Sequence, residues 1–294
     1  MKIVVIGGSG YLGSHVADSL SLAGHKVTIF DKKKSKWLKS NQNFIQGNIL
    51  NTKLLKRVIK NSDIVYHFAA LSDVDEATHK PKQTAIINII GTINVLEAAK
   101  KFKVRRVIYA SSIYAISIDG GFYRCSKRSA EDYIEEYKKL YGLKFTILRY
   151  GSLYGPRSNK TNGVHRIVSD ALEMKRLQYI GSKKAKRRYV HVKDAAKASL
   201  GVLSKKYENK YINLMGKRTY KVTELFYTLS KLLRLPNKVS FLNKMFTGHY
   251  VNSPKLFRII KGNNYKLKSA IKLEKGLKDL ISVIGTSKQT SQIF

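Results

Sequence analysis

The first 31 residues contain the feature that most restricts what this chain can fold into. Residues 2–6 form a β-branched run of strand length, and the segment GGSGYLG follows at residues 7–13. Apolar residues then recur at helical spacing from Leu12 to Ala23, and a second apolar run at residues 26–30 ends at Asp31. This order predicts a strand, a tight glycine turn, a helix and a second strand within about 30 residues.

The glycines and Asp31 each suit a task in binding a dinucleotide. Gly7 allows the tight turn, Gly10 lets the backbone approach a pyrophosphate at the helix N-terminus, and Gly13 lets the helix pack closely on the strand. Asp31 follows about 20 residues later, where a carboxylate accepts hydrogen bonds from the hydroxyls of an adenosine ribose. That carboxylate repels a 2′-phosphate and so favours NAD over NADP, although the lysines at 32–34 weaken the preference.

Strand-like and helix-like segments continue to alternate through the first half of the chain. We expect strands at 44–46, 64–68, 106–110 and 144–149, and helices at 53–60, 81–102 and 123–141. The alternation predicts an α/β fold: a Rossmann-type doubly wound parallel sheet covered by helices on both faces. Ligands of such a sheet bind beyond the carboxyl ends of the strands, so we look for function there.

The alternation of strands and helices becomes less regular in the second half of the chain. We expect helices at 164–175, 195–203 and 222–233, a short strand at 189–192, and a polar, frayed tail from about residue 286. The sequence therefore predicts a dinucleotide-binding domain at residues 1–160, with a returning segment near 187–213. Residues 161–294 are expected to form mainly a smaller C-terminal substrate-binding region.

The charge of the chain is high, at +37. Such a charge attracts phosphates and nucleic acids. However, the lysines are spread along the whole length, and no recognition helix, zinc finger or aromatic RNA-binding signature accompanies them. We therefore favour a compositional origin, and nucleic acid is not the expected partner.

The composition also excludes several classes of protein. A hydrophobic fraction of 43% and a charged fraction of 26% are typical of globular domains. The single cysteine, Cys125, excludes an internal disulfide framework and favours a reducing, cytoplasmic location. No apolar run is long enough for a membrane helix, and glycines interrupt the N-terminal run before it reaches signal-peptide length. The acids Asp73, Asp75 and Glu76 cluster after a predicted strand, but we expect no metal there.

A tyrosine and a lysine near the start of the helix expected at 123–141 could carry chemistry. The spacing of four places Tyr123 and Lys127 on one face of the helix, one turn apart. A neighbouring ammonium and a bound nicotinamide cation would both lower the pKa of a phenol, whose ordinary value is about 10, and so make it a usable base. Ser112, at the end of the preceding strand, could hydrogen-bond the same substrate oxygen.

These features occur with further motifs in a characteristic order. After the glycines come HFAA at 67–70, SS at 111–112, YRCSK at 123–127, LRYG at 148–151, YGPR at 154–157 and RRYVHV at 187–192. Together they resemble the extended short-chain dehydrogenase/reductase family, specifically its NAD-dependent nucleotide-sugar epimerase/dehydratase branch. The resemblance covers roughly residues 1–285, and its motifs are specific for the family but not for a substrate.

The resemblance implies a role for particular residues. Tyr123 would be the catalytic acid/base, Lys127 would hold the nicotinamide ribose and tune Tyr123, and Ser112 would complete the triad. Arg187 would bind the diphosphate of a nucleotide sugar, which suits a bidentate guanidinium. The implied NAD contacts are Gly7, Gly10, Tyr11, Leu12, Gly13, Asp31, Asn48, Ile49, Phe68, Ala69, Ala70, Tyr123, Lys127 and Tyr150. The implied substrate contacts are Ser111, Ser112, Tyr123, Ser152 and Arg187.

The departures from the family pattern narrow the expected reaction. Asn48 stands where the family usually has Asp near the adenine, and Ser152 replaces a common Asn. Dehydratases of the family carry Asp-Glu directly after the triad hydroxyl, and decarboxylases place an acid in the same region. Here the residues are Ile113 and Tyr114, so elimination of water would lack its proton donor.

The expected function is that of an NAD-dependent 4-epimerase of a nucleoside-diphosphate sugar, with a UDP-hexose as the leading substrate. Tyr123 would take the proton of the 4-hydroxyl, and the 4-keto sugar would turn before the hydride returns. The first alternative is an NAD(P)H-dependent 4-keto-sugar nucleotide reductase. The second is a non-catalytic NAD-sensing or nucleic-acid-binding protein. Members of the family often pair through the helices expected here at 81–102 and 123–141, so a homodimer is expected.

Two further residues are assigned structural roles. Cys125 lies two residues after Tyr123 and is expected to pack in the core. His191 is expected to orient a neighbouring backbone group and not to act as a base.

Overall fold

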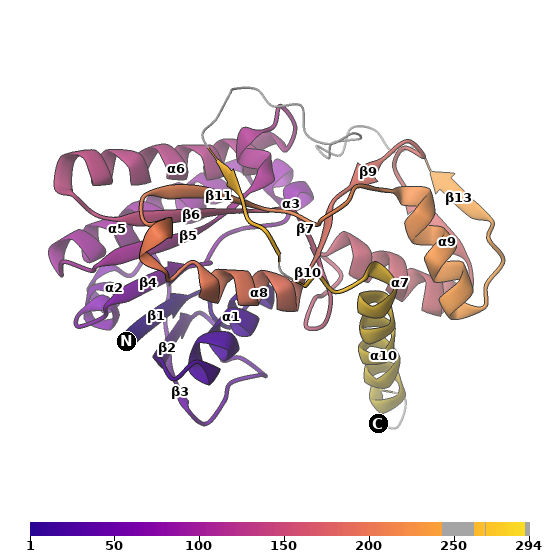
Figure 1. Ribbon diagram of the computed structural model, residues 1–294, viewed down its shortest axis with the longest axis horizontal. Helices are drawn as coiled ribbons and strands as arrows, with labels where there is room; N and C mark the ends of the chain where they lie inside the picture. Colours follow the sequence, from indigo (N-terminus) through magenta and orange to yellow (C-terminus); the bar gives the residue numbers. More distant parts are fainter. Residues whose placement is uncertain (243–261, 268, 292–294) are drawn as a thin grey trace.

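The larger part of the protein consists of a parallel sheet and the helices that cover it (Figure 1). The computed structural model describes residues 1–242, 262–267 and 269–291. Within these residues, eight strands form the sheet in the order β14-β11-β6-β5-β4-β1-β2-β3, and every neighbouring pair is parallel. The strands are β1 (Lys2–Ile6), β2 (Lys26–Asp31), β3 (Gln42–Gln46), β4 (Ile64–His67), β5 (Arg106–Ser112), β6 (Phe145–Tyr150), β11 (Lys210–Leu214) and β14 (Asn263–Asn264). The order from β3 to β6 is that of a doubly wound dinucleotide-binding sheet, so the predicted fold class is confirmed.

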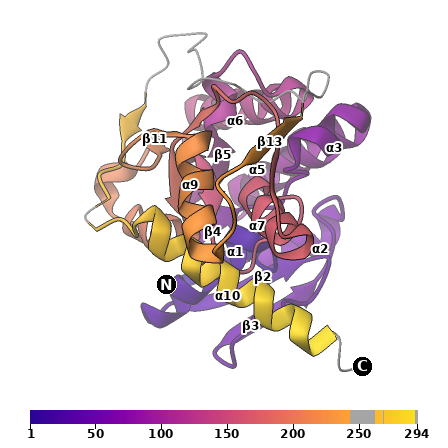
Figure 2. The ribbon, with the colours of Figure 1, turned by 90° about the vertical axis from the view of Figure 1, so that its right-hand side faces the viewer.

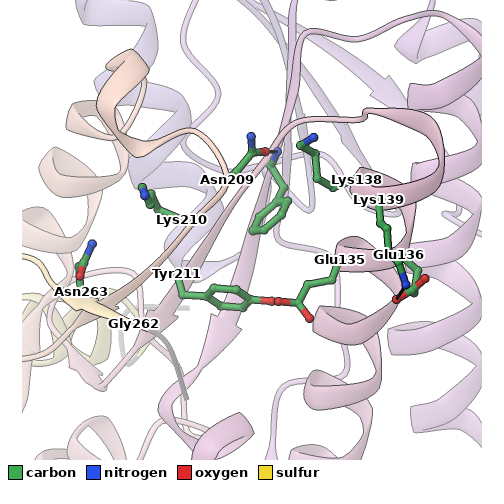
Figure 3. Close-up of a pocket in the computed structure, with 10 residues that line it drawn as sticks. Glu135, Glu136, Lys138, Lys139, Asn209, Lys210, Tyr211, Gly262 and Asn263 are labelled. Carbon is green, nitrogen blue, oxygen red and sulfur yellow. Dashed lines mark hydrogen bonds and ion pairs between the residues drawn. The ribbon is translucent and has the colours of Figure 1, made fainter. Parts of the chain in front are cut away.

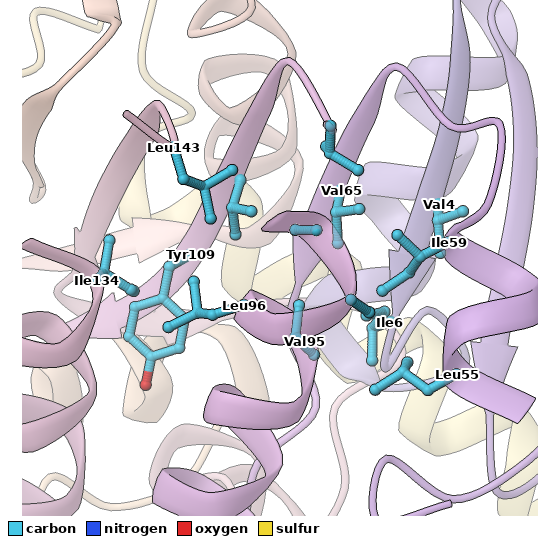
Figure 4. Close-up of a cluster of buried hydrophobic side chains, with 14 of the residues drawn as sticks. Val4, Ile6, Leu55, Ile59, Val65, Val95, Leu96, Tyr109, Ile134 and Leu143 are labelled. Atoms are coloured by element: carbon cyan, nitrogen blue, oxygen red, sulfur yellow. The ribbon is translucent and has the colours of Figure 1, made fainter. Parts of the chain in front are cut away.

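Helices cover both faces of this sheet, and the alternation of side chains along β1 shows why. Val4 and Ile6 point to one face, where α2 (Thr52–Ile59), α5 (Gly91–Lys101) and α6 (Gly121–Tyr141) contribute to one buried cluster (Figure 4). Ile3 and Val5 point to the other face and pack with α1 (Tyr11–Leu22) and α8 (Val192–Gly201). A strand buried on both faces reads as a continuous apolar run, as β1 does.

The long helix expected at 81–102 is interrupted. It begins with α4 (Pro81–Ala85), with Pro81 in the first turn as predicted, and continues through a π-helical segment, η1 (Ile86–Ile90), into α5. A separate short helix, α3 (Val74–His79), precedes it and was not predicted. Asp73, the first residue of the acidic cluster, accepts a hydrogen bond from the backbone N–H of Glu76. It therefore caps the N-terminus of α3.

A smaller part of the molecule lies beyond the carboxyl edge of the sheet (Figures 1 and 2). Its core is formed by α7 (Gly163–Met174), α9 (Val222–Leu233) and α10 (Leu273–Ser291). Three short strand pairs accompany these helices: β7 (Ser152–Tyr154) with β10 (Tyr189–His191), β9 (Lys186–Arg187) with β12 (Tyr220–Lys221), and β8 (Leu177–Ile180) with β13 (Val239–Leu242). Two 3₁₀ turns, η2 (Ile113–Ile116) and η3 (Lys205–Tyr207), complete the described elements.

Several expectations for the second half need correction. The tail expected to fray from about residue 286 continues as helix α10 to Ser291, because Leu273, Leu277, Leu280 and Ile284 anchor its earlier turns in a core. Strands β11 and β14 were not predicted, yet both join the main sheet beyond β6. The division at residue 160 stays a prediction. No helix among the described residues is long and apolar enough to span a membrane.

Candidate active site

The glycine turn lies against the end of the neighbouring strand β4. Gly7 has a φ of +79°, and a Cβ atom there would lie 2.4 Å from the backbone nitrogen of Ala69. A Cβ atom on Gly13 would lie 2.2 Å from the carbonyl oxygen of Gly7, so helix α1 can approach the strand only without a side chain. The turn that the sequence predicted is therefore present, and residues 68–70 lie beside it.

The groups around this turn fit a dinucleotide. The Asp31 carboxylate accepts hydrogen bonds from the backbone N–H groups of Ser9 at 3.0 Å and Lys33 at 3.3 Å, so it is fixed beside the turn with lone pairs left for a ribose. The hydroxyl oxygens of Ser9 and Tyr11 are buried and make no hydrogen bond with the described residues. Unpaired buried hydroxyls beside a helix N-terminus suit a ligand that supplies polar oxygens.

Other residues assigned to the cofactor lie around the same edge. Leu12 is in the first turn of α1, and Phe68 and Ala70 are half-buried after β4. Asn48 is exposed, and its side-chain oxygen accepts from the backbone N–H of Leu50 at 3.0 Å. Ile49 is buried. These positions are compatible with the predicted contacts, which stay predictions.

The structure brings Ser112, Tyr123 and Lys127 together. Ser112 ends β5 and Tyr123 lies in the first turn of α6, and the Ser112 side chain is near enough to the Tyr123 hydroxyl to act on its pKa. The Lys127 Nζ lies 5.9 Å from the centroid of the Tyr123 ring and donates to the carbonyl oxygen of Ala110 at 2.8 Å. A phenol, a hydroxyl and an ammonium thus meet at the carboxyl end of a central strand, where this fold binds its ligands.

Burial dominates the acid–base properties of this group. It raises the pKa of Tyr123 to about 12, while the hydrogen bond with Ser112 acts in the opposite direction. It also lowers the pKa of Lys127 to about 7, against the opposing charge of Glu131. Among the protein's own groups, desolvation outweighs the effect of Ser112 on Tyr123. The lowered pKa that we expect next to Lys127 and a bound nicotinamide cation stays a prediction.

Two residues assigned to ligands use their hydroxyls elsewhere. Successive residues of a strand point to opposite faces, so Ser111 faces away from Ser112, and it donates to Glu131 at 2.5 Å. The Tyr150 hydroxyl is buried and shares a hydrogen bond of 2.7 Å with Ser199. We therefore do not assign a ligand contact to either hydroxyl.

Sequence reasoning missed a buried ion pair next to the triad. Glu131, one turn after Lys127 on α6, accepts from Arg149 Nε at 2.9 Å and from Nη2 at 2.6 Å. Both side chains are nearly inaccessible, with exposed fractions of 5% for Glu131 and 1% for Arg149. The spacing of four between Tyr123, Lys127 and Glu131 placed Glu131 on the same face of the helix as the other two. Nothing in the sequence indicated that its partner would be an arginine on β6.

Asn88 was also missed. This buried residue of the π-helical segment binds both backbone groups of Leu71, accepting from the N–H at 2.8 Å and donating to the carbonyl at 2.9 Å. It also donates to the Ser126 hydroxyl at 2.9 Å. Asn88 therefore ties the segment after β4 to the helix that carries Tyr123.

The remaining assigned residues lie in the smaller part. Ser152 is on β7, opposite Tyr189 of β10. Arg187 is on β9, opposite Tyr220 of β12, and its Nη1 donates to the carbonyl of Lys186 at 2.9 Å. Arg187 is half-buried, and the other residue of its strand, Lys186, is also basic. Two neighbouring positive charges would attract an anion such as a diphosphate.

Of the two residues with a predicted structural role, His191 has that role and Cys125 does not. The His191 Nδ1 accepts from the backbone N–H of Lys193 at 3.3 Å and so caps α8, as predicted. Cys125 is exposed, so its predicted core packing is wrong. At two residues from the buried Tyr123, its side chain points to the other side of α6.

A separate pocket of about 690 Å³ lies at the other end of α6 (Figure 3). Its lining residues are Glu135, Glu136, Lys138, Lys139, Phe145, Asn209, Lys210, Tyr211, Gly262 and Asn263. Tyr123 and Glu135 are 12 residues apart, or about 18 Å along the helix axis. The pocket is therefore distinct from the candidate site.

The doubly wound sheet, the glycine turn and the Ser112, Tyr123 and Lys127 group define an extended short-chain dehydrogenase/reductase. Comparison with known proteins agrees. The family model described as the NAD dependent epimerase/dehydratase family matches residues 3–214. The chain belongs to this family, and NAD is its cofactor.

Relatives of known description are found at moderate identity. A putative UDP-glucose 4-epimerase of Methanocaldococcus jannaschii is 31% identical over 246 residues, which cover 76% of this chain and 80% of that protein. A UDP-N-acetyl-alpha-D-glucosaminuronate decarboxylase of Bacillus cytotoxicus is 29% identical over 81% of this chain and 82% of its own length.

A solved structure shows the same fold over nearly the whole chain. The UDP-glucose 4-epimerase of Thermotoga maritima, determined with UDP-glucose, aligns with a TM-score of 0.86 and 26% identity. The alignment covers 98% of this chain and all of that one.

Proposed function

We propose that the protein is an NAD-dependent nucleotide-sugar 4-epimerase that acts on a UDP-hexose. The observation that carries the proposal is the juxtaposition of Ser112, Tyr123 and Lys127, the last one turn after Tyr123, at the edge where the glycine turn lies. The 4-epimerases among the similar proteins support the choice of reaction, and UDP-glucose in the Thermotoga structure supports the choice of nucleotide.

The residues of this chain would divide the work as follows. The glycine turn and Asp31 would hold NAD, whose nicotinamide ring supplies a hydride acceptor and donor and a positive charge when it is bound. Tyr123 would take the proton of the sugar 4-hydroxyl while Ser112 holds the same oxygen by a hydrogen bond. Lys127 would stabilise the phenolate by its charge, opposing the effect of burial.

The sugar nucleotide would extend from Tyr123 toward the smaller part of the molecule. Arg187 would bind its diphosphate, and Ser152 would contact the sugar or a phosphate. Because the keto sugar must turn before it is reduced, the protein would gain most of its binding free energy from the nucleotide and little from the sugar.

The segment after Ser112 favours epimerisation over dehydration. Ile113 and Tyr114 begin the 3₁₀ turn η2; Ile113 is buried, and the Tyr114 ring lies edge-on to the Tyr123 ring at 6.1 Å. Neither residue has a carboxyl group. Loss of water from the sugar would require an acid near this position, whereas oxidation and return of a hydride at C4 requires none.

The proposal is tested by incubating the purified protein with NAD and UDP-, GDP-, dTDP- and CDP-sugars. Products are followed by NMR and reduced nicotinamide by absorbance. We expect two C4 epimers of a UDP-hexose to interconvert with no net change in NADH. A second incubation contains NADH and 4-keto-sugar nucleotides, and net consumption of NADH in it would instead identify a reductase. Cofactor binding without any product in either incubation would contradict both activities.

A pair of variants tests the assignment of the base. Tyr123→Phe removes the proton-transferring hydroxyl, so turnover should fall by orders of magnitude while NAD binding persists. Tyr66→Phe is a matched control, because the Tyr66 hydroxyl is buried on the opposite face of the sheet and donates to the carbonyl of Ser199 at 2.6 Å. Turnover that survives in Tyr123→Phe would refute the assignment.

We also propose that the protein forms a homodimer through α5 and α6. The Tyr137 hydroxyl donates to Glu97 at 2.5 Å and ties the two helices together. Beside this contact, Tyr133, Leu140 and Tyr141 are 44%, 65% and 55% exposed and form an apolar stripe along α6. Light scattering should give the mass of a dimer for the wild-type protein and of a monomer for Leu140→Glu. A monomeric wild-type protein would contradict this assembly.

A further inference from the structure

A layer of fully buried polar side chains lies behind Lys127, and the proposed reaction does not use it. Tyr109 of β5 and His67 of β4 are directly opposite each other in the sheet, and each is 1% exposed. Their rings lie 5.4 Å apart at an angle of 52°. Both face the helix layer formed by α5 and α6, and Figure 4 shows Tyr109 between Leu96 and Ile134 of those helices.

The His67 ring is held in one orientation. Its Nε2 lies 2.9 Å from the Thr92 hydroxyl, and that hydroxyl donates to the carbonyl of Asn88 at 2.6 Å. Because the single hydroxyl proton is already used, Thr92 accepts from His67, and Nε2 carries the imidazole proton. The remaining nitrogen, Nδ1, is buried without a partner among the described residues. Burial and the charge of Lys127 lower the pKa of His67 to about 3, so the ring stays neutral.

The Lys127 ammonium rests on this layer. Its Nζ lies 4.8 Å from the centroid of the Tyr109 ring and 2.8 Å from the carbonyl oxygen of Ala110, the next residue on β5. An aromatic face attracts a cation most strongly where water is excluded, and Lys127 is only 3% exposed. The ring is therefore one of few groups that can stabilise the charge of a desolvated lysine.

We propose that Tyr109 is a positioning residue for the reaction: its ring, fixed beside neutral His67, keeps Lys127 in its charged form next to Tyr123. The role of Lys127 in turnover rests on the proposed function, whereas its contact with Tyr109 does not. Among the residues that the structure describes, the titratable and charged groups around Lys127 are Tyr123 and Glu131 on α6, Tyr109 on β5 and His67 on β4. Arg149 on β6 is paired with Glu131.

The direction of the pH effect follows from this arrangement. A cation that loses a stabilising aromatic face gives up its proton more easily, so the midpoint of its titration moves to lower pH. The Tyr109→Leu variant should therefore shift the midpoint of Lys127 downward by about one pH unit, the size expected for a desolvated cation–π contact. Tyr109→Phe keeps the ring and should leave the midpoint within about 0.3 unit of the wild type.

The titration is measured directly by NMR on protein labelled with ¹³C at the lysine Cε, with Lys127 assigned by the loss of its signal in Lys127→Met. Tyr66→Leu is the control for loss of a core aromatic ring, since Tyr66 lies on the opposite face of the sheet. If Tyr109→Leu does not fold, pentafluorophenylalanine at position 109 replaces it. This ring has nearly the shape of phenylalanine and the opposite quadrupole, so it repels the cation and should shift the midpoint downward at least as far.

The proposal is overturned if the midpoint of Lys127 is unchanged by the loss or inversion of the ring. It is equally overturned if Tyr109→Phe or Tyr66→Leu shifts it as far as Tyr109→Leu. If turnover is detected, the fall in kcat at high pH should begin about one pH unit lower in Tyr109→Leu, with little change in KM. A wild-type protein without epimerase activity would refute the proposed function but leave the NMR result to decide the role of Tyr109.

Discussion

Replacing Glu131 by Gln should be among the most destabilising single changes in this protein. The carboxylate accepts from two nitrogens of Arg149, at 2.9 and 2.6 Å, and from the Ser111 hydroxyl at 2.5 Å. Gln keeps the shape of the side chain and removes its charge, so a guanidinium of 1% exposure loses the carboxylate with which it forms its ion pair. Breaking such a buried pair costs about 3 to 5 kcal/mol of unfolding free energy.

Urea unfolding followed by circular dichroism measures this loss. Glu274→Gln is the matched control, because Glu274 forms an ion pair with Lys278 at 2.9 Å in which both side chains are about 60% exposed. It should leave the unfolding midpoint unchanged.

The double variant Glu131→Met with Arg149→Met distinguishes the loss of the ion pair from the presence of an unpaired buried charge. Two apolar side chains leave no unpaired charge, so the double variant should be more stable than Glu131→Gln alone. A loss below about 1 kcal/mol in Glu131→Gln would show that the guanidinium finds water or another partner, and it would refute the reasoning.

Two further changes test the glycine turn and the anchoring of the segment after β4. Gly13→Ala should abolish NAD binding in a fluorescence titration, since its Cβ would lie 2.2 Å from the Gly7 carbonyl, whereas Gly163→Ala adds a methyl in open space and should bind NAD normally. Asn88→Ala removes three buried hydrogen bonds and should lower the unfolding free energy by at least about 2 kcal/mol, so an unchanged urea midpoint would contradict its anchoring role.

The parts of the fold that sequence predicts well are those encoded by neighbouring residues. The strand before Gly7, the helix after Gly10 and the strand ending at Asp31 were predicted because their periods and turn residues are local signals. The helix at Val222–Leu233 was predicted with its observed bounds for the same reason. Gly142 ends α6 with a φ of +70°, as expected of a C-terminal glycine.

The errors arise where distant residues decide the outcome. Ser111 and Ser112 look equivalent in sequence, and only the position of Glu131 on α6 shows that the first hydroxyl is already used. The π-helical segment at Ile86–Ile90 has no local signature, yet it contains the Asn88 that binds Leu71. Strand β14 has two residues, too few for any periodicity. In each case the deciding contact is between segments far apart in the chain.

One face of α6 explains why the chemistry and the stability of this site depend on each other. Tyr123, Lys127 and Glu131 are all buried and lie on successive turns of that face. A polar stripe in this position is unfavourable unless each group has a partner, and the partners are Ser112 and Ala110 on β5 and Arg149 on β6. The ion pair between Glu131 and Arg149 fixes the rotation and depth of the helix two turns from the phenol. Because a helix rotates as a unit, the same ion pair sets where the Tyr123 hydroxyl meets Ser112.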